Sequence, residues 1–383
     1  MNNRRIVISL YNMALTVFLF LYFLYRALFD SKFDSGLDTL VLILSVLAGV
    51  IVVGLNKTVK SNALVLYLLV GVFISFVFQQ FHFSDSRLFM LYLIGLALTN
   101  RSETQVTKIL FVSRIILILL IFALGGFAQR NGIGSNIGNV ALLYMCLYEN
   151  YFSRKKWCVI FLILATLSVV NPDNSGVLVV LSGVLLLQAL RNFEFGKKML
   201  CSKFTMLIYP ICLFATWFLS ASIRVDKMPL IGSIFPSSFN TLYLNFVSKL
   251  NIVLGTRLSL SKTALDKIGL HLLGGDYYTS GYSELALDAA NRKAYFMVDS
   301  GYILLLLRWG ILVTILICTI SIIVMKYFIK KRAYNFIIAG IALAFWAILE
   351  DSLFYGFILM FWGKALKDLY YMKFNRMVVE THE

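Results

Sequence analysis

Charged residues and prolines are scarce in this chain. Only 14% of its 383 residues are charged and 4 are prolines, whereas a soluble globular domain carries about 25% charged residues. With 60% hydrophobic residues and 24 glycines, the composition argues against a soluble domain and against a Pro/Gly-rich linker or a disordered tail. We therefore expect residues 1–383 to form one integral membrane domain.

The five cysteines form neither a CxxC pair nor a Cys/His spacing typical of a metal site. Each lies in or beside an apolar run, so we expect small packed thiols and no metal ion or other cofactor. The cysteines are Cys146, Cys158, Cys201, Cys212 and Cys318.

The N-terminus resembles a signal peptide, because Arg4 and Arg5 precede an apolar run. This run continues to about Phe29 and lacks a small-residue cleavage site. We expect it to be retained as the first helix.

Apolar runs of about 20 residues recur along the whole length, a pattern typical of a polytopic membrane protein. We predict an all-α chain with about twelve transmembrane helices. The predicted spans are residues 6–28, 37–55, 62–81, 86–98, 107–125, 133–151, 157–170, 175–191, 204–221, 300–327, 335–349 and 352–371.

Lysines and arginines are concentrated in the segments on one side of these helices. If the N-terminus is cytoplasmic, the short outer loops hold only Lys32, Arg87 and Arg130, and every cytoplasmic segment is basic. The positive-inside rule then places both termini in the cytoplasm. Because the basic residues form short clusters between apolar runs, the net charge of +16 does not indicate a nucleic-acid partner. The cytoplasmic segments contain Arg4, Arg5, Lys57, Lys60, Arg101, Lys108, Arg154, Lys155, Lys156, Arg191, Lys197, Lys198, Lys203, Lys326, Lys330, Lys331, Arg332, Lys367, Lys373 and Arg376.

Residues 222–300, between the ninth and tenth predicted helices, form the one long segment without a membrane-length apolar run. This topology places them outside the cell, where neither ATP nor nucleotide sugars are available. A substrate must arrive there already activated or already across the membrane. Within the loop, residues 239–254 and 258–273 show apolar residues at helical spacing. We expect two helices that lie along the membrane surface or cap the bundle, with Gly274 and Gly275 ending the second.

Two residues of this loop are candidates for binding a substrate. Arg257 begins the second loop helix, and its guanidinium suits a pyrophosphate because it binds phosphate oxygens in bidentate fashion. The alternative is an arginine that reaches lipid headgroups. His271 has no Cys or His nearby, so a packed or interfacial histidine is expected rather than a metal ligand.

The end of the loop contributes an acid, Asp299, where the chain re-enters the membrane. Asp299 suits the N-cap of the following helix, and it also suits a general base that deprotonates a sugar hydroxyl. Tyr302 and Arg308 follow on the helix, where Arg308 needs a polar partner or a water-filled cavity. Glu350, at the last outer turn, is a candidate partner for the loop arginines.

Residues 130–139 have the sequence RNGIGSNIGN at the outer mouth of the sixth predicted helix. The glycine spacing is not GxGxxG and no strand precedes it, so a nucleotide-phosphate loop is not indicated. Two interpretations stay open: an irregular helix start, or a cavity for a polar substrate lined by Arg130 and Asn136.

Three motifs together resemble a known family. They are R-x3-GSNIGN at residues 130–139, GTRLSLSKTAL followed by LLGG at residues 255–275, and VDSGYILLLLRWGIL at residues 298–312. With the order of helices and the single large outer loop late in the chain, they are similar to the Wzy-type polysaccharide polymerases and the related O-antigen ligases. The topology agrees along the whole length, and the motifs agree only in these segments.

The resemblance implies a metal-independent, inverting glycosyltransferase with a GT-C-like membrane fold. Such an enzyme transfers a growing glycan from undecaprenyl pyrophosphate to a lipid-linked repeat unit at the outer face of the bacterial cell membrane. Arg257 would bind the donor pyrophosphate, helped by Arg130 or Arg224. Asp299 stands where ligase relatives carry a histidine and would activate or orient the acceptor hydroxyl. A flippase and a chain-length regulator are the expected protein partners.

Two alternatives stay open at this point. A ligase that moves finished glycan to another acceptor uses the same parts. A transporter or flippase for the same lipid-linked sugar also fits twelve helices, but transporters usually show two similar halves with binding residues near the midplane. This chain shows no such repeat and its polar residues cluster outside, which favours the polymerase.

Overall fold

The computed structural model describes residues 2–31, 35–55, 93, 94, 97, 103–123, 140, 142, 143, 175–223, 237–254, 257–274, 298 and 300–349. Every regular element in this part of the chain is a helix and no strand occurs in it, which confirms the predicted all-α class. Five predicted spans lie wholly or largely outside the described residues: 62–81, 86–98, 133–151, 157–170 and 352–371.

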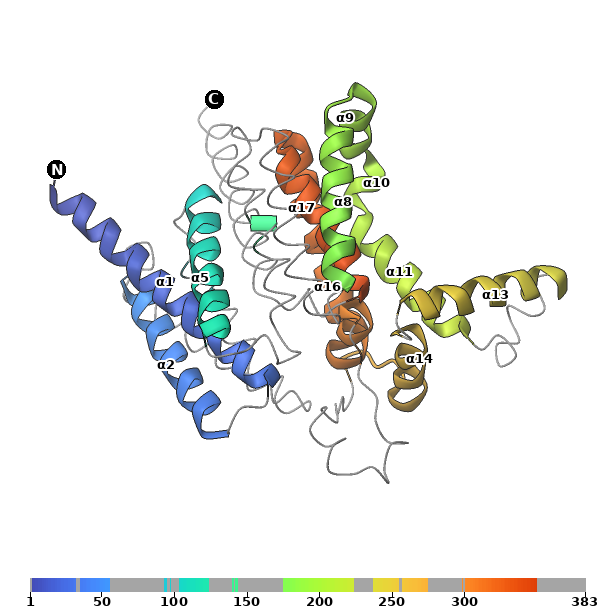
Figure 1. Ribbon diagram of the computed structural model, residues 1–383, viewed down its shortest axis with the longest axis horizontal. Coiled ribbons are helices and arrows are strands. Elements are labelled where there is room, and N and C mark those ends of the chain that lie inside the picture. The colour runs from blue at the N-terminus through green and yellow to red at the C-terminus, as the bar shows by residue number, and fades with distance from the viewer. Residues whose placement is uncertain are drawn as a thin grey trace, which may run out of the picture.

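The described helices form two packed groups (Figure 1). In the first group α1 packs against both α2 and α5, and in the second α17 packs against α8, α11 and α16. The bounds are Asn2–Ser31 for α1, Ser35–Gly54 for α2, Glu103–Ala123 for α5, Ser175–Arg191 for α8, Ile208–Ala221 for α11, Gly301–Lys331 for α16 and Tyr334–Leu349 for α17.

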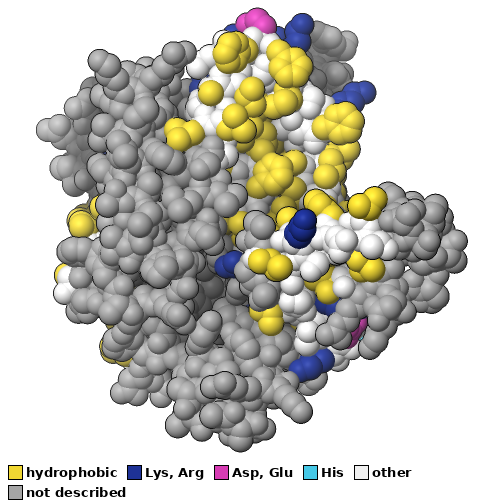
Figure 2. All heavy atoms as spheres, turned by 45° about the vertical axis from the view of Figure 1, so that its right-hand side comes forward, with side chains coloured by type: hydrophobic (Ala, Val, Ile, Leu, Met, Phe, Trp, Pro, Cys, Tyr) yellow, Lys and Arg dark blue, Asp and Glu magenta, His cyan; other side chains and the backbone are white. Residues whose placement is uncertain are grey.

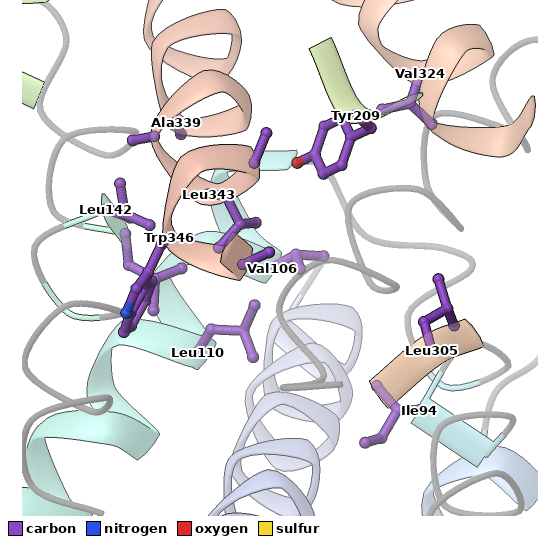
Figure 3. Close-up of a cluster of buried hydrophobic side chains, with 14 of the residues drawn as sticks. Ile94, Val106, Leu110, Leu142, Tyr209, Leu305, Val324, Ala339, Leu343 and Trp346 are labelled. Carbon is purple, nitrogen blue, oxygen red and sulfur yellow. The ribbon is translucent and has the colours of Figure 1, made fainter. Parts of the chain in front are cut away.

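One cluster of buried apolar side chains joins the two groups. Figure 3 shows Val106 and Leu110 of α5 and Leu343 and Trp346 of α17 among its members. The helices form because nearly every turn carries apolar residues, and the most buried faces of α1, α5, α16 and α17 meet in this cluster.

In the described part of the chain, α16 alone has the length and hydropathy of a membrane span: it has 31 residues, and an 18-residue stretch of it has a mean hydropathy of 2.5. Four shorter apolar helices accompany it, at Leu10–Tyr25, Thr39–Gly54, Ile208–Ala221 and Tyr334–Leu349. The all-helical class is therefore shown, and the crossing of a membrane by twelve helices stays a prediction.

Basic residues gather at one end of the second helix group. Arg191, in the last turn of α8, donates from Nη1 to the Asn335 side-chain oxygen at the start of α17 (2.6 Å) and lies over the Tyr334 ring. The short helices α9 (Glu194–Leu200) and α10 (Lys203–Met206) follow α8. Their exposed ion pair joins Lys197 to Glu194, and this hydrogen bond and charge hold the pKa of Glu194 below its ordinary value. Basic residues from segments that are distant in the sequence thus lie at one end of this helix group, as the distribution of charge along the sequence predicts.

The opposite end holds α13 (Ser237–Val253) and α14 (Arg257–Ile268). Helix α14 packs against α11 and α16 and buries Leu258, Ser261 and Ala264, so it caps the bundle. It ends at Ile268, because Gly269 has a left-handed φ of 76° that glycine adopts without steric cost. The predicted end at Gly274 and Gly275 is wrong, since residues 270–274 leave the helix to contact α16.

Candidate functional site

Helix α16 is broken at Gly310, which has φ 80° and ψ 176°. Two backbone hydrogen bonds join the break to the loop that follows α14: Ile311 N donates to His271 O (3.0 Å) and Leu312 N donates to Leu272 O (3.1 Å). The sequence predicted one continuous helix here. That prediction is wrong, because the loop backbone takes the place of the preceding helical turn as hydrogen-bond acceptor.

The loop backbone approaches Gly310 so closely that no side chain fits. A Cβ atom at this position would lie 2.2 Å from Gly274 N and 2.5 Å from Leu272 O. After the break, the first N–H groups of α16 have no hydrogen-bond acceptor within the helix. A buried N–H group needs a hydrogen-bond acceptor. The two loop carbonyls supply it, so they hold residues 271–274 against α16.

The break brings two predicted site residues to the same region. Arg308 is half-buried and lies two residues before Gly310. His271 lies in the loop segment that is hydrogen-bonded to the break. Its ring Nε2 is 2.8 Å from Ile268 O, and its side chain is exposed. The backbone of His271 is thus fixed to α16 within three residues of Arg308.

Arg257 stands at the other end of α14. Its guanidinium is half-buried and donates from Nη1 to Leu254 O (3.4 Å), at the end of α13. Asn251 also joins the two helices, because its side-chain oxygen accepts from Ser259 N (3.1 Å) in the first turn of α14. From Arg257 to Ile268 the helix rises about 17 Å. Arg257 and His271 therefore flank α14 rather than meet.

Tyr302 is 1% exposed and lies in the first part of α16. Its hydroxyl donates to Ala344 O (3.0 Å) on α17, and the thiol of Cys212 on α11 lies within hydrogen-bonding reach. These contacts tie three helices together. Because Tyr302 is buried and contacts two other helices, its side chain fixes the position of α16.

Replacing Tyr302 with phenylalanine is expected to lower the free energy of unfolding by about 1 kcal/mol, since one neutral hydrogen bond is lost. Tyr302→Ala should cost about 3–5 kcal/mol through the cavity it leaves. Thermal unfolding of the purified protein measures both. A phenylalanine variant that unfolds at the wild-type temperature would show that this hydrogen bond does not contribute to stability.

Five predicted site residues, Arg130, Asn136, Arg224, Asp299 and Glu350, lie outside the described residues. On either side of Asp299, Val298 is 4% and Ser300 2% exposed. The N-cap of α16 is Ser300, whose carbonyl accepts from Leu304 N (2.9 Å). Asp299 itself lies outside the described residues, so its interpretations as a capping residue and as a base both stay predictions.

The break at Gly310 and the buried position of Arg114 were not predicted from the sequence. An isolated glycine in an apolar helical pattern, as in RWGIL, was the only signal for the break at Gly310. Arg114, in the middle of α5, is 3% exposed, and its guanidinium carbon lies 3.6 Å from the centre of the Phe23 ring on α1. A charge inside an apolar run was the signal for this buried cation.

Comparison of the chain with protein-family models, with curated proteins and with solved structures gave no match. In the described part of the chain, no group of three or more His, Cys, Asp or Glu side chains is placed to hold a metal ion. A functional proposal therefore rests on the motifs and on the geometry of the loop and of α16.

Proposed function

We propose that this protein polymerises undecaprenyl-pyrophosphate-linked oligosaccharide repeat units at the outer face of a bacterial cell membrane. The hydrogen bonds between the loop and the broken helix are the observation that carries the proposal. Leu272 begins the LLGG part of one motif of the family resemblance and directly follows His271, and Ile311 and Leu312 belong to another motif. Motifs that are separate in sequence are thus joined backbone to backbone, as parts of one site would be.

The dimensions of α16 support a membrane position for this site. Residues 311–331, after the break, rise about 31 Å, which matches a hydrocarbon thickness of about 30 Å. Lys330 and Lys331 end this part, while Leu312, Ile315 and Leu316 near its start expose 51–57% of their surface. Under this proposal the basic end faces the cytoplasm, and the break and α14 lie at the outer surface.

The chemistry follows from the groups that the motifs supply. The acceptor hydroxyl oxygen attacks the anomeric carbon of the donor, and the bond from that carbon to the pyrophosphate oxygen breaks with inversion. The Asp299 carboxylate takes the hydroxyl proton, and Arg257 stabilises the negative charge on the departing undecaprenyl pyrophosphate. We also assign substrate binding to Arg130, Arg224 and Glu350 from their places in the sequence, and to His271 and Arg308, which lie beside the break.

Alanine variants of Arg257 and Asp299 test this proposal in cells that lack the native copy. We expect long surface glycans to collapse to single repeat units, because loss of a positioned base typically costs about 100-fold to 10,000-fold in rate. The matched control is Lys267→Ala, which removes an exposed cation from the last turn of the same helix. Immunoblots of the membrane fraction must show equal protein levels. Full-length glycan ladders in both site variants would refute the proposed roles.

A transporter for the same lipid-linked sugar is the second candidate, since broken helices also form transporter binding sites. Such sites lie near the bilayer midplane. Here the break lies a full hydrocarbon thickness from Lys331, which favours a surface site. In the same experiment, absence of single repeat units outside the cell would favour transport. Ladders of normal length that are not attached to their final acceptor would favour a ligase.

A further inference from the structure

Helix α13 leaves the bundle and extends crosswise to α8 (Figure 1). Among the described helices it packs mainly against α14. Its direction is fixed at the end of α11, where the Tyr243 and Ser222 hydroxyls are 2.6 Å apart and the Tyr243 ring contacts Phe218 at 6.2 Å between centroids. The orientation of α13 is therefore set by side-chain contacts at the end of the bundle.

One side of α13 is buried against the protein, and the other side is exposed and carries large apolar side chains. Val247, which faces the protein, is 1% exposed, whereas Leu242 and Phe246 lie one turn apart and are 70% and 58% exposed. Thr241 and Ser248 are exposed as well. Ile252 follows one turn after Ser248 and is 71% exposed, so the exposed side of α13 carries both polar and large apolar side chains. Large apolar side chains that are exposed on a helix indicate that another protein or a membrane covers them.

The position of α13 relative to the basic end identifies that surface. The nearly continuous helical path from Lys203 through α10 and α11 to Ser222 rises about 28 Å, close to the hydrocarbon thickness of about 30 Å. Along it, Ile211 and Phe214 are 44% and 61% exposed. Figure 2 shows an exposed hydrophobic band with charged side chains above it and further basic side chains below it. Helix α13 thus lies at the lower edge of an apolar band of membrane thickness.

We infer that α13 is an interfacial helix, with Leu242 and Phe246 inserted between the headgroups and acyl chains of the outer leaflet. Lys249 is exposed beside Leu242 on the helix surface and reaches the lipid phosphates with its ammonium group. The loop helices, whose place the sequence left open, therefore divide the two roles: α14 caps the bundle and α13 lies along the membrane. This inference needs the membrane placement proposed above and is independent of the polymerase chemistry.

A photoreactive residue tests this contact in the complete chain. We would introduce p-benzoylphenylalanine separately at positions 242 and 246. The matched controls are positions 263 and 267, two exposed polar residues of α14 with the same spacing. The protein is reconstituted in nanodiscs of phosphatidylethanolamine and phosphatidylglycerol, irradiated, and analysed by mass spectrometry. We expect lipid adducts at 242 and 246 in several-fold excess over 263 and 267.

Three results would overturn the inference: adducts to a second copy of the chain at 242 and 246, equal lipid labelling at all four positions, or none at any. Each labelled protein must unfold at the wild-type temperature, so that misfolding is recognised. A parallel set in the Asp299→Ala background separates this inference from the enzymatic proposal. The lipid adducts should persist there, even if the enzymatic proposal fails.

Discussion

Replacing Gly310 with alanine is expected to abolish polymer formation and to destabilise the protein. The φ/ψ values of Gly310, 80° and 176°, lie in a region that is essentially restricted to glycine, and any other residue there costs about 1–3 kcal/mol. The added Cβ would also overlap Gly274 N and Leu272 O. These are backbone atoms, so no rotamer change relieves the overlap, which costs about another 1–3 kcal/mol.

The alanine variant should separate the loop from α16 before it unfolds the bundle. The hydrogen bonds from Ile311 and Leu312 to the loop carbonyls lengthen when residues 272–274 move away from the new side chain. Under the proposed function, the surface glycan should then stay at single, unpolymerised repeat units, since the two motifs no longer meet. Glycan ladders normalised to membrane protein, together with thermal unfolding, measure the two effects separately.

Gly183 provides the matched control for this substitution. It lies inside α8, and a Cβ added there meets nothing within 4 Å. Gly183→Ala should therefore stabilise the helix by about 0.5–1 kcal/mol and leave the ladders unchanged. Wild-type ladders and wild-type stability in Gly310→Ala would show that the contact between loop and helix has no role in the reaction.

The helices were predictable because their signal is local. Apolar residues at every turn of residues 6–28 or 335–349 indicate a helix regardless of its neighbours, and both segments are helical in the structure. The basic end was predictable for a similar reason. The cations in and around α9 and those at residues 326–332 form clusters between apolar runs, and such clusters are expected on the same side of the protein. These signals need no knowledge of tertiary contacts.

The site geometry depends on contacts between distant segments, which local patterns do not contain. The end of α14 at Gly269 and the break at Gly310 arise together, because residues 270–274 gain hydrogen bonds only where α16 opens to accept them. Tyr302 was predicted from its spacing after Asp299, but its partner Ala344 lies on another helix. Arg114 likewise has its ring partner, Phe23, on α1.

Replacing Gly196 with alanine is expected to reduce the amount of protein without changing the length of its product. Gly196 lies in α9, where a Cβ would be 1.8 Å from Leu190 O and 2.4 Å from Leu190 C in α8. This overlap with backbone costs roughly 3 kcal/mol, because α9 must move away from α8 to relieve it. The displacement disturbs the basic end, where Arg191 holds Asn335 at the start of α17.

Gly340→Ala is the matched control for Gly196, because it overlaps a flexible side chain instead of backbone. A Cβ at Gly340 would lie 2.7 Å from Met325 Sδ, and an unbranched thioether can rotate away. Its cost should stay below about 1.5 kcal/mol. Membrane immunoblots should show a large loss of protein for Gly196→Ala and little loss for Gly340→Ala. The glycan chains that each variant makes should have the normal length distribution. If Gly196→Ala shortened the glycan at normal protein levels, the reaction would depend on the basic end, and a site confined to the opposite end of the bundle would be refuted.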